Sequence, residues 1–506
     1  MTGRRNRRSP RVIDRPTTRG SRAGLALLAL AVACARNPVS GRPEVTLVSK
    51  AQERELGEAE AKRVAETMGI VDDRPELSAY VRAVGERLAR VSPRTDVTYT
   101  FQIVDLEEPN AFALPGGPVY ISRGLLALTN SEDELAGVLG HEIGHVAARH
   151  AVRRVTRAAP LAVVTGLGAA VTGLVSPILG DLVGGIGGVA GALVLAPYSR
   201  EQEREADRIG QELAAKAGWD PAGLSRSLHT LEREEALHPG EKRPNAFFAT
   251  HPPLPDRVAD TLTRAASLER TAAPLVAGPG GILPRLDGLV VGPSAANGVF
   301  DGETFLHPDL EFRVRFPAGW KTANDRTVVG ASAPDGRAIV GLELVDKGSD
   351  PDAALRAFEQ GAKIDLASHA DRLRVGDLPA THATAAARTR EGVVALDLTW
   401  IAYADRIYRI VGATPPDRAA AAKPLFRSTV ESFRPLTADE RAGIRETRLR
   451  IVDPRRGERL VDVLRRTHSP WTPDVAAVAN GLEGGGTLRP EQPVKIAVVE
   501  PYAAGR

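Results

Sequence analysis

Cysteine and aromatic residues are scarce in this sequence. Its 506 residues include a single cysteine, Cys34, so no disulfide can form within the chain, and zinc or iron–sulfur sites built from cysteines are excluded. Aromatic residues make up only 4%, so the cores must consist largely of Ala, Val and Leu. Hydrophobic (43%) and charged (25%) residues are as frequent as in ordinary globular proteins. The length predicts several domains, at roughly 100–200 residues each.

Positive charge is concentrated at the N-terminus. The chain carries a formal net charge of +3, but residues 1–33 contain eight arginines and one acid, Asp14. Without that segment the net charge is −4. The remaining chain has no basic stripe with interleaved aromatic residues, which is the usual signature of nucleic-acid binding. The sequence therefore predicts no nucleic-acid partner.

An apolar segment, residues 23–33, follows the arginines and ends at Cys34. It is too short to span a bilayer, and its basic, apolar and small-residue order is typical of a secretory signal. The small residues directly before Cys34 resemble a bacterial lipobox. We therefore predict a signal peptide over residues 1–33 and lipidation of Cys34, which becomes a membrane anchor. The alternative is a plain signal peptide with an incidental cysteine.

A helix is predicted over residues 131–146, because a capping box opens the segment and apolar residues recur on one face. His141 and His145 lie four residues apart, so both imidazoles leave the same face and can bind a single zinc ion. Glu142 lies beside them. A carboxylate at this position can take a proton from a water that attacks a peptide carbonyl. The segment thus predicts a hydrolytic zinc site.

A catalytic zinc site needs a third protein ligand and one open position. The metzincin spacing is excluded, because Ala151 stands where the third histidine of that class would be. His150 follows His141 by nine residues, which places it close to the opposite side of a continuous helix. We therefore expect His150 at the surface and look for the third ligand further along the chain.

A second amphipathic helix is predicted to begin after Tyr198. Glu203 is the glutamate closest to its apolar stripe, whereas Glu201 and Glu205 point more outward. An acid that faces inward is costly unless it is paired or bound to metal, so Glu203 is the predicted third ligand. Asp207, one turn later, is expected to accept a hydrogen bond from a ligand imidazole. The alternative for Asp207 is a surface salt bridge.

The order of several motifs resembles peptidase family M48, a family of zinc metallopeptidases. The resemblance covers residues 37–265 and implies a mainly helical, zincin-like (gluzincin) domain with a small edge-strand sheet. It rests on Asn37-Pro38-Val39-Ser40-Gly41-Arg42, the segment from Asn110 to Gly117, the HExxH motif, the segment from Ser199 to Asp207, and Thr250-His251-Pro252 followed by Arg257.

The resemblance also implies roles for individual residues. His141, His145 and Glu203 would bind one zinc ion per chain, with Glu142 as the general base, in agreement with the helical argument. His251 would lie near the metal as a regulatory ligand or an oxyanion partner. The residues expected to support or regulate the ligands are Asp207, His251 and Arg257.

A strand with a Pro-Gly-Gly turn is predicted between Asn110 and Tyr120. As an edge strand it could hold an extended substrate by main-chain pairing, which gives affinity with little sequence preference. The alternative is a purely structural hairpin, but the family resemblance favours substrate binding. The residues expected to do this are Asn110, Ala111, Phe112 and Ala113.

Residues 158–199 are rich in Gly and Ala and contain one charged side chain before Ser199, Asp181. The segment is long enough to cross a membrane. Its ends, however, lead to predicted zinc ligands that must converge on one site. We therefore favour a buried or membrane-facing helical pair over a true membrane span.

Three further segments follow the peptidase-like region. Residues 266–300 are rich in Gly, Pro and Ala and predict a linker. Residues 301–436 predict an α+β accessory domain that resembles the PsbP-like fold, and residues 447–499 resemble a small βααβ LysM domain, a glycan-binding unit. Within the accessory domain, strands are predicted over 338–345, 393–403 and 406–412, and helices over 351–365 and 417–433.

Together these features predict a multidomain zinc endopeptidase that is exported to the periplasm and anchored to the outer membrane through Cys34. Its substrates would be misfolded or unassembled envelope polypeptides, and residues 447–499 would contact peptidoglycan. The alternative is a cell-wall-anchored binding or chaperone protein. In that case the zinc site would be structural, or latched by His251.

Overall fold

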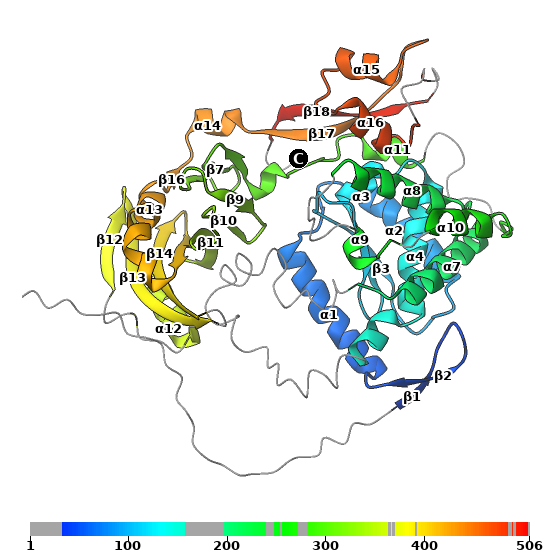
Figure 1. Cartoon of the computed structure of the whole chain (residues 1–506), viewed down its shortest axis with the longest axis horizontal. Helices are drawn as coiled ribbons and strands as arrows, with labels where there is room; N and C mark the ends of the chain where they lie inside the picture. Colours follow the sequence, from blue (N-terminus) through cyan, green and yellow to red (C-terminus); the bar gives the residue numbers. More distant parts are fainter. Residues whose placement is uncertain are drawn as a thin grey trace, which may run out of the picture. The chain divides into compact units, whose positions relative to one another are not determined.

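The structure is a computed structural model whose described residues fall into two compact units (Figure 1). The sheet unit is Ala295–Ile444. The helical unit comprises the described residues before and after it. The predicted signal peptide up to residue 32, and residues 158–196 of the predicted helical pair, lie outside the described part. The described residues are 33–156, 197–238, 247–253, 256–271, 281–362, 366, 370–389, 392–483, 488 and 492–503.

Helix α4 (Glu132–Ala147) is the centre of the helical unit, and almost all of its residues are buried. It confirms the helix predicted over 131–146, and the Ser131 side chain caps it by accepting from the Glu134 N–H. Three helices pack against it: α2 (Pro75–Arg90), α7 (Arg200–Ala217) and α8 (Gly223–Ala236). Helix α7 begins with a capping box formed by Ser199 and Gln202.

A three-stranded sheet lies beside α4, in the order β3-β5-β4. Strand β3 (Thr100–Val104) runs parallel to β5 (Pro118–Ser122), while β4 (Ala111–Ala113) pairs antiparallel with β5 and forms an edge. Gly116 and Gly117 turn the β4–β5 hairpin with φ angles of 83° and 123°, which favour glycine. The predicted strand and turn are thus present.

Further elements complete the N-terminal part of the helical unit. They are β1 (Ala33–Arg36), β2 (Pro43–Thr46), α1 (Lys50–Thr67), α3 (Arg123–Leu128), α9 (Phe247–Thr250), α10 (Arg257–Ala265) and α11 (Ile282–Leu286). Among the described residues, no helix combines the length and apolar character that a membrane span requires.

The C-terminal residues belong to the same helical unit. Strands β17 (Arg445–Val452) and β18 (Val494–Pro501) pair antiparallel and enclose α15 (Leu460–Arg466) and α16 (Pro473–Ala479). The free edge of β17 pairs with the segment that follows α11. There, the Leu449 N–H donates to the Leu289 carbonyl at 2.7 Å. Leu449 also belongs to the hydrophobic core that contains α2 and α4. The C-terminal segment therefore completes this core.

Lys495 in β18 is buried against the start of α4. Its Nζ donates to the carbonyls of Ala127 (2.7 Å) and Thr129 (3.0 Å), at the end of α3. Burial lowers the pKa of Lys495 to about 7, and the charge of Glu134 opposes this shift. A side chain from the C-terminal segment thus satisfies two carbonyls that directly precede α4.

The sheet unit is built on a seven-stranded antiparallel sheet in the order β12-β13-β14-β15-β11-β10-β9. Helix α12 packs on one face and α13 on the other, because alternate residues of the strands belong to two separate hydrophobic clusters. A four-stranded sheet has the order β16-β8-β7-β6. The elements are η1 (Ala295–Asn297), β6 (Val299–Asp301), β7 (Thr304–His307), β8 (Phe312–Arg315), β9 (Lys321–Asn324), β10 (Val328–Ser332), β11 (Ile339–Lys347), α12 (Pro351–Ala362), β12 (Asp371–Val375), β13 (Leu378–Thr389), β14 (Gly392–Tyr403), β15 (Arg406–Thr414), η3 (Pro416–Arg418), α13 (Ala419–Glu431), β16 (Arg434–Pro435) and α14 (Ala438–Gly443).

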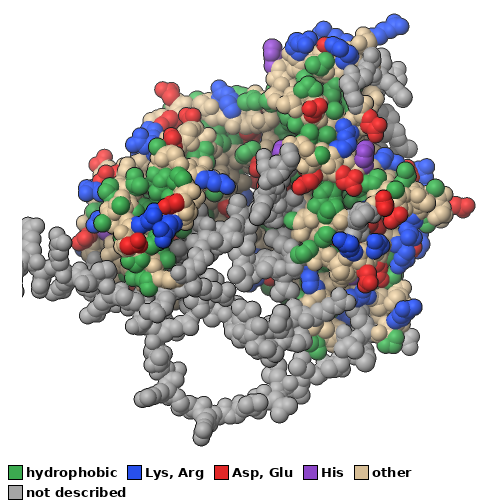
Figure 2. Space-filling view, viewed as in Figure 1, with side chains coloured by type: hydrophobic (Ala, Val, Ile, Leu, Met, Phe, Trp, Pro, Cys, Tyr) green, Lys and Arg blue, Asp and Glu red, His purple; other side chains and the backbone are tan. Residues whose placement is uncertain are grey.

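The predicted succession of a mainly helical region and a β-rich region is confirmed. Acidic and basic side chains are interspersed on the face drawn in Figure 2. The domain limits 37–265, 266–300, 301–436 and 447–499, and the LysM-like assignment, stay predictions.

We expect Lys495→Met to lower the free energy of unfolding by about 1–3 kcal/mol, because two buried carbonyls lose their donor. The loss should grow between pH 7 and 10. In that range the unfolded chain keeps the lysine proton, whereas the folded chain has lost it, so the wild type gains stability with rising pH and the variant does not. Urea unfolding at several pH values measures this difference. The exposed Lys216→Met is the control, and a pH-independent difference would contradict the prediction.

Candidate metal centre

Four buried side chains from three parts of the helical unit converge on one point. His141 and His145 lie on α4, Glu203 on the first turns of α7, and His251 directly after α9. One ligand atom of each lies within 4.8 Å of the others, and each side chain is at most 2% exposed. The structure thus brings together the three side chains predicted as ligands and the histidine implied by resemblance.

The spacing of these atoms allows them to bind one shared cation. His141 Nε2 lies 3.0 Å from His145 Nε2 and 3.6 Å from Glu203 Oε2, and His145 Nε2 lies 3.5 Å from Glu203 Oε1. His251 Nδ1 is 3.2 Å from His141 Nε2 and 3.1 Å from Glu203 Oε1. A tetrahedron with metal–ligand bonds of about 2.0–2.1 Å has edges of about 3.3 Å. His251 stands at the fourth corner.

Polar groups behind two of the ligands favour tautomers that leave the inner nitrogens available for a metal. His141 Nδ1 lies 2.8 Å from Asp207 Oδ1. An imidazole that donates through Nδ1 to a carboxylate carries a lone pair on Nε2. Burial holds the pKa of His145 well below its usual value, which also favours the neutral ligand form. Two such nitrogens 3.0 Å apart fit a shared cation.

Asp207 and Arg257 form a buried ion pair next to the ligands. Arg257, the first residue of α10, donates Nε and Nη2 to the two Asp207 oxygens at 2.8 and 2.7 Å. Its Nη2 also lies 3.0 Å from Glu203 Oε2. Burial would raise the pKa of Asp207, but Arg257 and His141 lower it. Asp207 is only 5% exposed, so the alternative of a surface salt bridge is wrong.

Glu142 is the one acid at the centre without such support. Its side chain is fully buried, and neither carboxylate oxygen has a hydrogen-bond partner among the described residues. His251 Nε2 lies 3.5 Å from Glu142 Oε1. Burial raises the pKa of Glu142, although the charges of His251 and His141 oppose the shift. This carboxylate is therefore poised to exchange a proton.

The outer edge of β4 faces the same centre. Asn110 and Leu114 pair with β5, so the main-chain groups of Ala111 and Ala113 point to the other side. There, His251 Nε2 lies 3.3 Å from the Ala111 carbonyl oxygen. The buried side-chain amide of Asn110 has no hydrogen-bond partner among the described residues. The predicted edge strand thus adjoins the metal ligands.

His150 is buried, which shows that the expected surface position is wrong. Helix α4 ends at Ala147, and Arg149 adopts a left-handed φ of 57° before a new helical stretch over 150–156. The projection of a continuous helix therefore fails after Ala147. The turn brings His150 Nδ1 to 2.8 Å from His145 Nδ1. Sequence reasoning missed this residue because nothing in the motif marks the turn.

Glycines let α4 and α7 approach backbone to backbone. A Cβ atom on Gly210 would lie 2.6 Å from the His141 backbone nitrogen, and one on Gly144 would lie 2.9 Å from the Ala206 carbonyl oxygen. Real side chains do not reach such distances. Gly140 and Gly144 of α4 thus pack against α7, and this approach sets the distance between Glu203 and the two histidines, whereas Gly137 packs against Leu224 at the start of α8.

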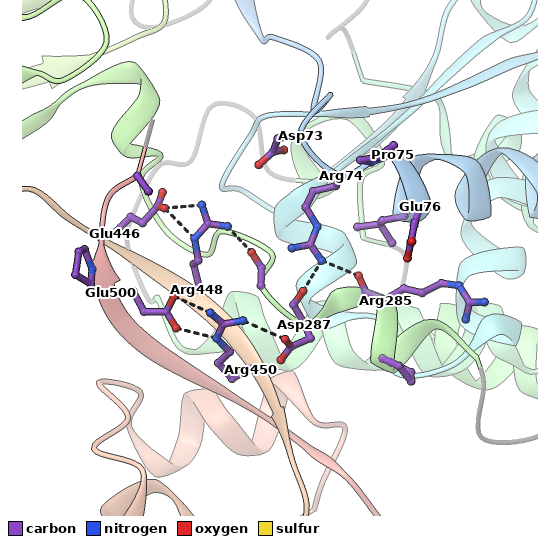
Figure 3. Close-up of a pocket in the computed structure, with 15 residues that line it drawn as sticks. Asp73, Arg74, Pro75, Glu76, Arg285, Asp287, Glu446, Arg448, Arg450 and Glu500 are labelled. Carbon is purple, nitrogen blue, oxygen red and sulfur yellow. Dashed lines mark hydrogen bonds and ion pairs between the residues drawn. The ribbon is translucent and has the colours of Figure 1, made fainter. Parts of the chain in front are cut away.

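A cavity of about 840 Å³ lies elsewhere in the helical unit, where β17 and β18 meet the start of α2 (Figure 3). Arg450 contacts Glu500 at 2.7 Å and Asp287 at 3.0 Å, and Arg448 pairs with Glu446. These acids and guanidinium groups satisfy one another. The lining therefore joins the C-terminal strands to the rest of the unit.

Comparisons with known proteins point to the same part of the chain. A model described as Peptidase family M48 matches residues 75–265, which include all four residues of the cluster. The Beta-barrel assembly-enhancing protease of Escherichia coli (strain K12) is 30% identical over 231 residues, 45% of this chain and 47% of that protein. The chain thus spans about half the length of that relative. Metalloprotease YcaL of Escherichia coli (strain K12) is 30% identical over 220 residues, 42% of this chain and 82% of that protein.

One of the matching solved structures bears the name of the fold that the sequence predicts for residues 301–436. Cyanobacterial PsbP (CyanoP) from Synechocystis sp. PCC 6803 matches at 14% identity with a TM-score of 0.22, covering 28% of this chain and 98% of that one. A TM-score this low decides nothing about the fold, so the PsbP-like resemblance of residues 301–436 stays a prediction.

We expect Gly210→Ala to cost about 1–3 kcal/mol of unfolding free energy and to weaken metal binding, because the added Cβ pushes α7 away from α4. Chemical unfolding and metal titration measure the two effects. Gly361→Ala is the matched control, since a Cβ on this helical glycine of α12 meets nothing within 4 Å. That change should be neutral or stabilise by up to about 1 kcal/mol. Equal behaviour of the two variants would contradict the close-packing argument.

Proposed function

Because the chain belongs to peptidase family M48, we propose that it is a zinc-dependent endopeptidase that cleaves misfolded or unassembled proteins of the bacterial cell envelope. The observation that carries the proposal is the convergence of His141, His145 and Glu203 beside the carboxylate of Glu142, which no described residue hydrogen-bonds. The name of the assembly-enhancing protease supports a role in the envelope, as does the predicted export signal. We place the protein in the periplasm, held at the outer membrane through Cys34.

The proposed reaction is hydrolysis of a peptide bond. His141, His145 and Glu203 would hold zinc, which supplies Lewis-acid chemistry by polarising a carbonyl and acidifying water. Glu142 accepts the proton of the attacking water and delivers it to the leaving amine. Its burial supports the first of these steps, because a raised pKa makes the carboxylate a stronger base toward the proton of the water. Asp207 orients His141, and Arg257 holds Asp207 in place.

Strand β4 is the proposed docking edge for the substrate. An extended polypeptide can pair with the outward main-chain groups of Ala111 and Ala113, as a further strand of the sheet. Such pairing reads the backbone and not the side chains, which suits unfolded substrates of varied sequence. The unpartnered amide of Asn110 offers one further donor and acceptor next to this edge.

His251 obstructs both halves of this proposed site at once. Its Nδ1 stands at the fourth corner of the ligand set, and its Nε2 lies within hydrogen-bonding distance of the Ala111 carbonyl. A substrate needs the open metal position and the strand carbonyl. We therefore propose that His251 acts as a latch, which must swing away before cleavage.

The same observation favours a second candidate function. A closed set of four protein ligands is typical of structural zinc sites, whereas catalytic sites keep one position open. The protein would then be a binding or chaperone protein held at the cell wall, with residues 447–499 as its peptidoglycan contact. Family membership and the position of Glu142 favour the enzyme.

We expect Glu142→Gln to retain one zinc ion per chain and to lower casein cleavage by about 10²–10⁴-fold, since the proton acceptor is lost while the ligands remain. Metal analysis and a cleavage assay on the chain without its predicted signal peptide test this. Glu201→Gln, at an exposed position on α7, should cleave like the wild type. Retained cleavage by Glu142→Gln would refute the mechanism.

His251→Ala separates the latched enzyme from the binding protein. Removal of the imidazole vacates the fourth corner and the Ala111 carbonyl, so the enzyme proposal expects cleavage to rise severalfold above the wild type. The measurement is casein cleavage at equal zinc content. If wild type and His251→Ala both bind zinc and neither cleaves, the binding-protein alternative is favoured.

A further inference from the structure

We propose that His150 and Glu205 act as a positioning pair that orients His145 toward the metal. The inference rests on the proposed zinc site and concerns residues that the HExxH pattern does not include. His150 contacts His145 and Glu205, and both contacts lie on the side of the His145 ring away from the four-residue cluster. His150 touches no substrate-facing group among the described residues, so it is a positioning residue and not a catalytic one.

The contacts form a chain of hydrogen bonds with one direction. His145 presents Nε2 to the cluster, so its Nδ1 carries the ring proton. His150 Nδ1, at 2.8 Å, must then accept that proton's hydrogen bond. The proton of His150 is consequently on Nε2, which lies 3.1 Å from Glu205 Oε2 and donates to it. The carboxylate thus fixes the tautomer of His150, and His150 fixes that of His145.

Two further contacts hold this chain in place. Glu205 Oε2 accepts from Arg153 Nη1 at 3.2 Å, and the Gln202 side chain donates to the His150 carbonyl at 3.4 Å. Gln202, Glu203 and Glu205 all lie on the first two turns of α7. One short stretch of helix therefore supplies a metal ligand and also the support for a second ligand on α4.

The left-handed turn that aims His150 inward is itself held by buried charges. Arg149 at the turn donates to Glu53 Oε2 on α1 at 3.0 Å, and Arg94 makes a bidentate pair with the same carboxylate. A left-handed φ of 57° is strained for arginine. Such a strained conformation persists only where the surrounding contacts hold it in place. This argues that the position of His150 is specified and not incidental.

The two ligand histidines are supported differently. His141 meets a carboxylate directly, through Asp207. His145 reaches its carboxylate, Glu205, only through a second imidazole. Tyr198 also stacks on the His145 ring, with ring centroids 3.8 Å apart and an angle of 25°. Stacking limits tilting of the ring, and the His150 contact at Nδ1 sets its rotation in the plane together with the Nε2 contacts to His141 and Glu203.

The test is zinc affinity, measured by competition with a chromophoric chelator on the chain without its predicted signal peptide. His150→Leu and Glu205→Gln should weaken zinc binding by about 10–100-fold. His150→Asn keeps a carbonyl oxygen near the Nδ1 position, which can still accept from His145, so it should lose several-fold less affinity than His150→Leu. Glu201→Gln, an exposed change on the same helix, should bind like the wild type.

The visible absorption of the cobalt-substituted protein gives a second measure of ligand geometry. We expect the bands of His150→Leu to shift and those of His150→Asn to resemble the wild type. Glu205 is partly exposed, so Glu205→Gln reports even if His150→Leu fails to fold. Zinc affinity of Glu205→Gln within twofold of the wild type would overturn the inference, and so would equal losses in His150→Asn and His150→Leu. If the wild type itself bound no zinc, the proposed function would fail as well.

Discussion

Helices α4 and α7 meet backbone to backbone, and the geometry of the metal centre depends on this contact. Helix α4 carries His141 and His145, and α7 carries Glu203. The separation of the two helices therefore decides whether these side chains can bind the same metal ion. Gly140, Gly144 and Gly210 make that separation possible, because side chains of any size would force the two backbones apart. The helices give up some intrinsic helix propensity at these positions in return for the approach.

Several buried acids surround the centre, and they differ in whether an arginine pairs with them. Burial of a charge is costly unless a partner compensates it. Asp207 has Arg257, Glu203 has Arg257 and the histidines, and Glu53 has Arg94 and Arg149. Glu142 stands apart, since no described residue hydrogen-bonds its carboxylate. Its carboxylate lies 3.5 Å from His251 Nε2, further than the arginines lie from the other three acids.

The spacing of apolar residues in the sequence predicted the structure correctly where the chain forms regular helices and strands. Helix α4 and the inward position of Glu203 follow from the spacing of apolar residues, and strands β14 (Gly392–Tyr403) and β15 (Arg406–Thr414) lie close to the predicted ranges 393–403 and 406–412. The buried position of His150 was not predicted. Its orientation depends on the left-handed conformation of Arg149, which is held by Glu53, almost a hundred residues earlier. Long-range contacts of this kind leave no local pattern. His251 was found through family resemblance only, for the same reason.

The path of the chain has a consequence for how the protein must be made. The sheet unit is inserted into the helical unit, because β17 pairs with the segment around Leu289 and Lys495 reaches the end of α3. Residues 445–503 emerge from the ribosome after the whole sheet unit. Until they arrive, the core around Leu449 lacks part of its cover and the carbonyls of Ala127 and Thr129 lack their donor. Helix α4, which carries His141 and His145, therefore gains its full packing only after the whole sheet unit has been synthesised.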